Sequence, residues 1–282
     1  MAAPRVSVIL PATGDERLLG AALESFAAQA LRDFEVVLVG EGDETARAAE
    51  RFADRAKIVH VRRKAASRAE ARNAGVAAAT GELVWLAADD HVALPDALEA
   101  IAGEHAGEAA IVVGAQSPGD GFFDAVAPLV ARFGAALDGL ALPWLAALGG
   151  WYSLPRAALA EFGGFDERFA GWEGDDLDLP LRWCASGKPI RVTRRAVCAR
   201  QAHDRDAQPV ALADQVETLA RKHGALDAWL LWRFLREDDF DAIHQVAVER
   251  ARGATAAGRE LERVADEILR MSLRATRGWF RP

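Results

Sequence analysis

The sequence predicts an α/β protein with a doubly wound, mostly parallel sheet, helices on both faces of that sheet, and a C-terminal helical extension. Two observations carry this prediction. Short β-branched apolar runs alternate with segments of helical period over the first hundred residues. Such alternation is typical of parallel strands that are covered by helices on both faces. From about Val210 only helical periods remain, so we expect one domain at 1–209 and an extension at 210–282.

The individual elements follow from local signals. Val6 to Leu10 is a short apolar run that stops at Pro11, which is typical of a buried strand. Ser67 and Glu70 form a capping-box pattern that predicts the start of a helix. Strands are expected at 6–10, 34–39, 57–61, 83–86, 110–113 and 190–199. Helices are expected at 18–26, 44–52 and 67–80 and from Pro95, and in the extension at 215–223, 226–235 and 254–276, with a hinge at 252–258.

Composition narrows the class of protein. The chain has 282 residues, of which 51% are hydrophobic, and a net charge of −8. It contains no run of about 18 apolar residues and no signal-peptide pattern, which predicts a cytoplasmic protein. The acidic balance argues against a nucleic-acid partner. Cys184 and Cys198 give neither a disulfide framework nor metal-ligand spacing.

The glycine-rich, acidic segment from Gly163 to Leu179 is the most informative part of the chain. Apolar residues follow it at helical spacing, which places Asp175 and Asp176 near the first turn of a helix. Free N–H groups and the helix dipole favour negative charge there, so helix capping is one interpretation. Capping needs one acid, and four lie between positions 173 and 178. A general base or a metal site is therefore the interpretation that we favour.

Six short motifs occur in order along the chain. They are Val6-Ser-Val-Ile-Leu-Pro11, Ala71-Arg-Asn-Ala-Gly75, Gly81-Glu-Leu-Val-Trp-Leu-Ala-Ala-Asp-Asp90 followed by Pro95, Gly163-Gly-Phe-Asp-Glu167, Trp172-Glu-Gly-Asp-Asp176, and His203. Together they resemble the family 2 glycosyltransferases with the GT-A fold, over roughly residues 4 to 205. The resemblance implies an inverting enzyme that moves a sugar from a nucleotide-diphosphate donor to a carbohydrate or other hydroxyl acceptor, with Mn²⁺ or Mg²⁺.

The resemblance also assigns catalytic and metal-binding roles. It places the general base at Asp176, with Asp175 orienting the acceptor or the base. The metal would lie at Asp89 and Asp90, with Asp89 the better ligand and a donor contact, because a strand end holds carboxylates on rigid backbone. His203 would complete the metal shell or contact the diphosphate. The alternative for Asp89 and Asp90 is an Asp-rich turn that caps the following helix. The alternative for His203 is an exposed position in a loop.

Two further groups of donor contacts are expected. Pro11, Ala12 and Thr13 would line the nucleotide pocket through backbone groups. Arg72 and Asn73 would face the same sheet edge, where an arginine can pair with phosphate or stack near the base; a surface Arg72 beside Glu70 is the alternative.

The chain departs from the family pattern at two positions. Gly40 stands where relatives carry an acid that contacts the base, so Glu41 or backbone groups are expected to substitute, with weaker dependence on uracil. Ala87 stands at the first position of the acidic motif, which weakens the metal assignment.

Acceptor contacts are expected from aromatic side chains, because sugar rings pack their apolar faces on indole. Trp172 and the adjacent Glu173 are the main candidates. Trp151 is a second platform or, equally, a core residue. His91 is expected at the surface beside the site.

Other functional classes remain open. The two departures also suit a degenerate transferase that binds sugar nucleotide or a partner without turnover. A sugar nucleotidyltransferase would need a basic, glycine-rich loop where Pro11 to Glu16 is acidic, and a nicotinamide oxidoreductase would need G-x-G-x-x-G. The amphipathic, arginine-rich tail 264–282 suits self-association or peripheral contact with an anionic membrane; docking on its own domain is the alternative.

Overall fold

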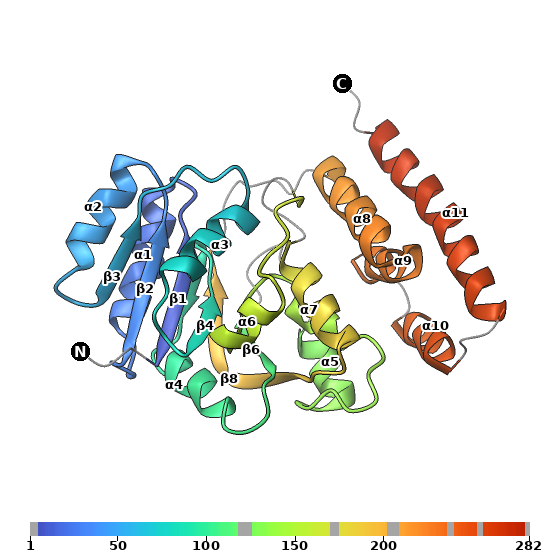
Figure 1. Ribbon diagram of the computed structural model, residues 1–282, viewed down its shortest axis with the longest axis horizontal. Helices are drawn as coiled ribbons and strands as arrows, with labels where there is room; N and C mark the ends of the chain where they lie inside the picture. Colours follow the sequence, from blue (N-terminus) through green and yellow to red (C-terminus); the bar gives the residue numbers. More distant parts are fainter. Residues whose placement is uncertain are drawn as a thin grey trace.

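The computed structural model describes residues 5–117, 126–169, 175–201, 209–235, 240–252 and 256–279. Within them, eight strands form one sheet with helices on both faces (Figure 1). The spatial order is β3-β2-β1-β4-β7-β6-β8-β5. The strands are β1 (Val6–Pro11), β2 (Phe34–Val39), β3 (Lys57–Val61), β4 (Leu83–Leu86), β5 (His91–Ala93), β6 (Ile111–Ser117), β7 (Tyr152–Pro155) and β8 (Ile190–Arg200).

The sheet is mostly parallel, as predicted. β1 pairs in parallel with β2 and β4, β2 with β3, and β6 with β8. β7 runs antiparallel between β4 and β6, and β5 runs antiparallel to β8. Neither β5 nor β7, which have three and four residues, was expected from the sequence. Strands this short show a period only weakly, and β4, also of four residues, was predicted from its continuous apolar run.

Helices cover both faces of the sheet, which confirms the predicted fold class. In chain order the helices are α1 (Glu16–Ala27), α2 (Asp43–Phe52), α3 (Arg68–Ala78), α4 (Ala97–Glu104), α5 (Val126–Phe133), the 3₁₀ turn η1 (Pro143–Ala147), α6 (Arg156–Glu161), α7 (Asp175–Ala185), α8 (Pro209–His223), α9 (Ala225–Phe234), α10 (Phe240–Arg252) and α11 (Ala256–Trp279). The capping residue of α3 is Ser67, whose side chain accepts a hydrogen bond from the Glu70 N–H, as its sequence pattern predicts.

Two hydrophobic clusters, one on each face, hold the layers together. Alternate residues of β1 divide between them: Ile9 packs with α3, α6 and α7, whereas Val8 packs with α1, α2 and α4. This is the expected geometry of a strand whose two faces are both buried. The carboxyl ends of β1, β2, β3 and β4 therefore meet at one edge, next to the N-terminal end of α3.

The C-terminal helices α8 to α11 lie at the end of the molecule away from α2 and β3 (Figure 1). Leu231 and Leu269 of this extension belong to the same buried cluster as Leu177 and Trp183 of α7. The helices therefore dock on the sheet domain through a shared core. The boundary at 209/210 coincides with the start of α8 but stays a prediction, and residues 253–255 of the expected hinge lie outside the described ranges.

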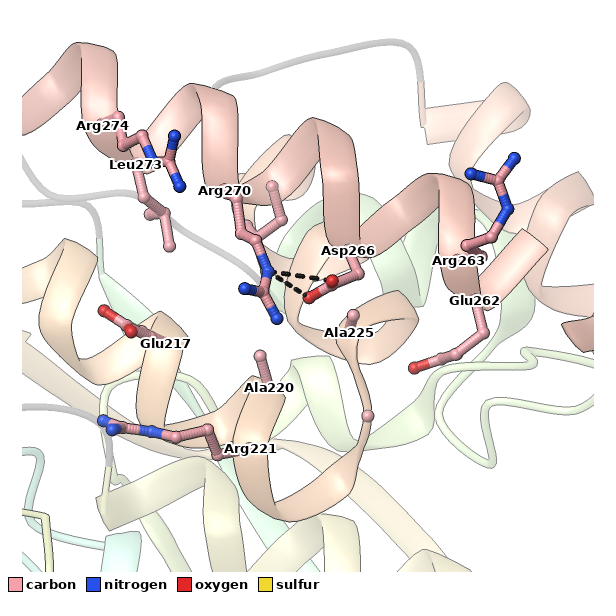
Figure 2. A pocket seen from close by; sticks show the side chains of 12 residues that line it. Glu217, Ala220, Arg221, Ala225, Glu262, Arg263, Asp266, Arg270, Leu273 and Arg274 are labelled. Atoms are coloured by element: carbon pink, nitrogen blue, oxygen red, sulfur yellow. Dashed lines mark hydrogen bonds and ion pairs between the residues drawn. The ribbon is translucent and has the colours of Figure 1, made fainter. Parts of the chain in front are cut away.

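A groove in the C-terminal helices is remote from the sheet edge. It has a volume of about 800 Å³ and lies between α8, the start of α9 and α11 (Figure 2). Arg270 pairs with Asp266 along its wall. Leu269 and Leu273 of the tail are buried, whereas Met271 is 63% exposed. Contact of this tail with a partner or membrane stays a prediction. Among the described helices, none has the length and apolar run that crossing a bilayer requires.

Candidate active site

Asp89 joins two loops at the carboxyl edge of the sheet. It follows β4, and its Oδ2 accepts hydrogen bonds from the Thr13 N–H, at 2.8 Å, and from the Thr13 hydroxyl. Thr13 follows β1, so the contact ties neighbouring strand ends together. The Asp89 side chain is fully buried. The structure therefore gives this carboxylate the rigid strand-end position that its sequence pattern predicts.

A cavity of about 360 Å³ opens beside this contact. Ala12, Thr13 and Glu41, three of the predicted donor contacts, line it, and so does Ala71 at the inner face of α3. Pro11 is buried at the end of β1. Arg63 and Lys64, which follow β3, also line the cavity. These two cations were not predicted as site residues, although their position after a strand of the sheet is the signal that would have identified them.

Position 40 has little room for a side chain. A β-carbon on Gly40 would lie 2.9 Å from Thr45 Oγ1 and 3.2 Å from the Ala12 β-carbon. The Gly40 carbonyl also lies 3.0 Å from His60 Nε2. The glycine at this position is therefore built into the packing between β1 and α2.

The two arginines of α3 bind the acid pair at the start of α7. Asp175 accepts from Arg68 Nε at 2.8 Å and from Arg72 Nη1 at 2.6 Å. Asp175 and Arg72 are each 1% exposed. Burial by itself raises the pKa of Asp175, but the charges and hydrogen bonds of the two guanidinium groups outweigh it, and the pKa is lowered. The predicted contact of Arg72 with a phosphate is thus replaced, in this structure, by an ion pair that fixes α7 on α3.

Asp176 shares Arg68 with Asp175, but its hydrogen bond comes from the backbone. Its Oδ2 accepts from the Gly149 N–H at 3.2 Å and lies 3.4 Å from Arg68 Nη2. Gly149 and Gly150 adopt φ angles of 92° and 69°. A β-carbon on Gly150 would lie 2.4 Å from Arg72 Nη2, so this turn approaches the ion pairs closely only because it is glycine. The carboxylate of Asp176 is therefore oriented by one backbone hydrogen bond and by the charge of the Arg68 guanidinium.

Asn73 binds the backbone of the glycine-rich turn and is not one of the residues that line the cavity. Its side-chain amide donates to the Phe165 carbonyl and accepts from the Phe165 N–H, both at 2.9 Å. A β-carbon on Gly164, whose φ is 74°, would lie 2.8 Å from Asn73 Oδ1. The predicted donor contact at Asn73 is corrected accordingly, because both polar atoms of its side chain hold the glycine-rich turn.

Asp90 and His91 also differ from expectation. Asp90 Oδ2 accepts a hydrogen bond from Arg200 Nη2 at 2.6 Å, so this carboxylate pairs with an arginine and not with the predicted metal. His91 is fully buried rather than at the surface. Burial lowers its pKa to about 3, and its Nδ1 accepts from the Ala88 N–H. A neutral imidazole packs edge-on against Trp151.

Trp151 is a core residue. It has no exposed area, its Nε1 donates to the Ala196 carbonyl at 3.1 Å, and its ring centroid lies 4.5 Å from that of Trp85. An indole in this position cannot present a face to a sugar, so the acceptor role is dropped. Trp172, Glu173 and His203 lie outside the described residues.

A second cluster of charges, not expected from the sequence, lies behind α7. Asp178 is fully buried. The side chains of Arg182, Lys222 and His223 surround its carboxylate. Lys222 Nζ lies 2.6 Å from Asp178 and 2.5 Å from Asp166. Burial by itself raises the pKa of Asp178, but hydrogen bonds from His223 and Lys222 outweigh it and lower the pKa. The last turn of α8 thereby holds the helix that carries Asp176.

The described residues offer few ligands to a metal ion. In the residues that the structure describes, no three His, Cys, Asp or Glu side chains gather around one point. Mg²⁺ in nucleotide sites takes one or two carboxylates and completes its shell with water and substrate phosphates, and Mn²⁺ shares this preference for oxygen. Asp89 therefore stays the predicted ligand of an ion that would arrive together with a diphosphate.

The arrangement of the sheet and its helices is similar to that of the GT-A glycosyltransferase structures. The sequence model of glycosyl transferase family 2 matches residues 7–130, and the curated relatives of the chain are named glycosyltransferases, which together identify the protein as a glycosyltransferase. The chain is 28% identical over 308 residues to validoxylamine A glucosyltransferase of Streptomyces hygroscopicus subsp. jinggangensis, and the match covers 94% of this chain and 71% of that relative.

Solved structures share the fold at low identity. A mannosyltransferase of Pyrobaculum calidifontis, in complex with GDP-Man and Mn²⁺, matches with a TM-score of 0.62 and 19% identity, over 100% of this chain and 89% of that one. Residues 1–349 of TarS from S. aureus, in complex with UDP, match with a TM-score of 0.59 and 18% identity. That match covers 77% of this chain and 65% of TarS 1–349. The two neighbours hold different nucleotides, so the shared fold leaves the base open.

Proposed function

We propose that the protein is an inverting glycosyltransferase that uses a nucleotide-diphosphate sugar and transfers the sugar to a hydroxyl acceptor, with a divalent ion at Asp89. The observation that carries this proposal is the position of α3. Its Ala71 lines the cavity at the strand ends, while Arg68 and Arg72 of the same helix hold Asp175 and Asp176. One rigid helix therefore sets the distance between a donor cavity and a pair of acids.

The donor fits the cavity by position and chemistry. In open α/β sheets, ligands bind outside the carboxyl ends of the strands. Thr13 and the backbone after β1 would contact the nucleotide, and Lys64 supplies positive charge at the cavity wall. A divalent ion held by Asp89 would neutralise charge on the leaving diphosphate.

Asp176 is the proposed general base. In the transfer step, the acceptor oxygen forms a bond to the anomeric carbon, and the bond from that carbon to the diphosphate oxygen breaks with its electron pair. Asp176 takes the proton of the acceptor hydroxyl. The Gly149 N–H and the Arg68 guanidinium fix the direction of this carboxylate.

The test is Asp176→Asn, compared with Asp54→Asn at an exposed position of the same chemistry. Positioned base catalysis contributes about 10²–10⁴-fold, so kcat should fall by that order while donor affinity stays nearly unchanged. Asp54→Asn should retain the wild-type kcat. If Asp176→Asn keeps more than about a tenth of it, the base lies elsewhere, and Asp175 is the next candidate.

The second candidate is a degenerate transferase that binds a sugar nucleotide without turnover. It is favoured by Ala87, which is fully buried in place of an acid, and by the pairing of Asp90 with Arg200. Incubation of the purified protein with nucleotide sugars separates the two candidates. Release of nucleoside diphosphate over hours, lost in Asp176→Asn, supports the enzyme, whereas binding without any release supports the degenerate protein.

A further inference from the structure

On the side of the donor cavity formed by β2 and α2, the residue directly after β2 is not an acid. Gly40, directly after β2, has no room for a side chain because Thr45 and Ala12 fill the adjoining space. Glu41, the next residue, is exposed. Neither position places a buried carboxylate against a nucleotide.

Glu44 reaches the cavity instead, from the first turn of α2. A β-carbon on Gly42 would lie 1.7 Å from Glu44 Oε1, so the carboxylate occupies the space that a side chain at position 42 would need. A β-carbon on Gly14 would lie 3.8 Å from the same oxygen. The Glu44 carboxylate therefore lies between the loops after β1 and β2, is half-buried, and lines the cavity.

The rest of the cavity supplies apolar walls and a cation. Val39, Ala65 and Ala71 line it with apolar surface, which suits the faces of a planar base. Lys64, whose side chain ends in an ammonium group, is one of the lining residues, whereas the neighbouring Arg63 is paired with Glu70 at 2.7 Å. The cavity thus combines a two-oxygen acceptor, a cationic donor and apolar walls.

We propose that this cavity selects guanine, with Glu44 accepting from the base N1–H and N2–H groups and Lys64 donating to its O6. The inference rests on the proposed function, because it assumes that the cavity takes the nucleotide. Guanine presents two adjacent donors to one carboxylate, which allows a bidentate, charge-assisted pair. Uracil presents one N–H between two carbonyl oxygens, and adenine presents an acceptor beside its amino group, so both leave one Glu44 oxygen facing a lone pair. Lysine and arginine are the usual partners of guanine O6 and N7.

The experiment measures the affinities of GDP, UDP, ADP and inosine diphosphate for the full chain by calorimetry, with and without Mn²⁺. Inosine diphosphate lacks only the N2 amino group of GDP, so it isolates one of the two proposed hydrogen bonds. GDP should bind about tenfold or more tighter than each of the others, which is the discrimination of one good bidentate pair. Glu44→Gln should remove about tenfold of the GDP affinity and little of the UDP affinity. Glu50→Gln, at an exposed position of the same helix, is the matched control.

The outcomes separate this inference from the function on which it rests. Tighter binding of UDP than of GDP, or a GDP to UDP ratio that Glu44→Gln changes no more than Glu50→Gln does, overturns the inference and leaves the transferase standing. Equal affinities for GDP and inosine diphosphate would contradict the proposed bidentate contact of Glu44 with the N1–H and N2–H groups. Failure of every nucleoside diphosphate to bind the wild-type protein overturns the proposed donor cavity itself.

Discussion

Arg72 and Asp175 form a buried ion pair, at 2.6 Å, between residues 103 positions apart in the sequence. Both side chains are 1% exposed, and Arg68 completes the pair from the next turn of α3. The pair joins the helix beside the donor cavity to the helix that carries Asp176. Removing one partner of such a pair leaves a charge buried without compensation.

We expect Asp175→Asn to lower the free energy of unfolding by about 3–5 kcal/mol, the usual cost of breaking a buried pair. Chemical denaturation at neutral pH measures it, with Asp54→Asn as the control for a change at an exposed site. A loss below about 1 kcal/mol would show that Arg72 finds another partner or reaches water.

The same ion pair makes the free energy of unfolding depend on pH. The pKa of Asp175 is lowered in the folded protein, relative to about 3.9 in the unfolded chain. The ionised Asp175 therefore contributes fully to the free energy of unfolding above about pH 4. This contribution is lost as the pH falls through the pKa of the folded protein. The difference in unfolding free energy between wild type and Asp175→Asn should be constant near neutral pH and should shrink below about pH 4. A difference that grows on acidification would contradict the sign of the shift.

Lys222 of α8 should affect catalysis without contacting the substrate. Its Nζ bridges Asp166 and Asp178, on either side of the start of α7. We expect Lys222→Met to lower kcat by about tenfold to hundredfold, the scale of a small misplacement, with the donor KM unchanged. Lys222→Arg should restore much of the rate, because a guanidinium can span the same two carboxylates.

Arg221→Met is the matched control for Lys222, because Arg221 lines the groove of Figure 2. Amide hydrogen exchange gives a readout that needs no activity: Lys222→Met should raise exchange in α7 and at 163–169 but not in α1. Uniform loss of protection would mean that Lys222 serves global stability only.

The metal assignment at Asp89 predicts that excess chelator abolishes transfer and that Mn²⁺ or Mg²⁺ restores it. Asp89→Asn keeps an oxygen that can accept from Thr13 but removes the charge that a hard cation needs. We expect this variant to lose about 10²-fold or more of kcat, since charge neutralisation by the ion is worth several kcal/mol. Full activity of the wild type in chelator would identify a metal-independent site.

The sequence predicted the parts of the site that depend on local order. A strand that ends in two aspartates and a helix that begins with two more can be read along the chain, and Asp89 and Asp175 lie where this reading puts them. Partners across long separations could not be read. Arg72 shows the right charge for a phosphate and for Asp175 alike, and only the packing of α3 on α7 decides between them.

His91 illustrates the second limit. A polar residue after two aspartates suggests a surface loop, but β5 pairs with β8 and buries the ring. A strand of three residues gives no period to predict from. The contact of Lys222 with Asp178 was equally hidden, because it joins the expected extension to the domain before it.

The contacts of Lys222 and His223 with Asp178 bear on how this chain can exchange parts with its relatives. A chimera that took its C-terminal helices from another family member would place a new helix end against Asp178, a fully buried carboxylate with a lowered pKa. Unless the incoming helix brought a cation at the position of Lys222 and a hydrogen-bonding side chain at that of His223, Arg182 would be left, of the three described partners, to stabilise that carboxylate. Recombination between relatives should therefore succeed when α7 and α8 are inherited together.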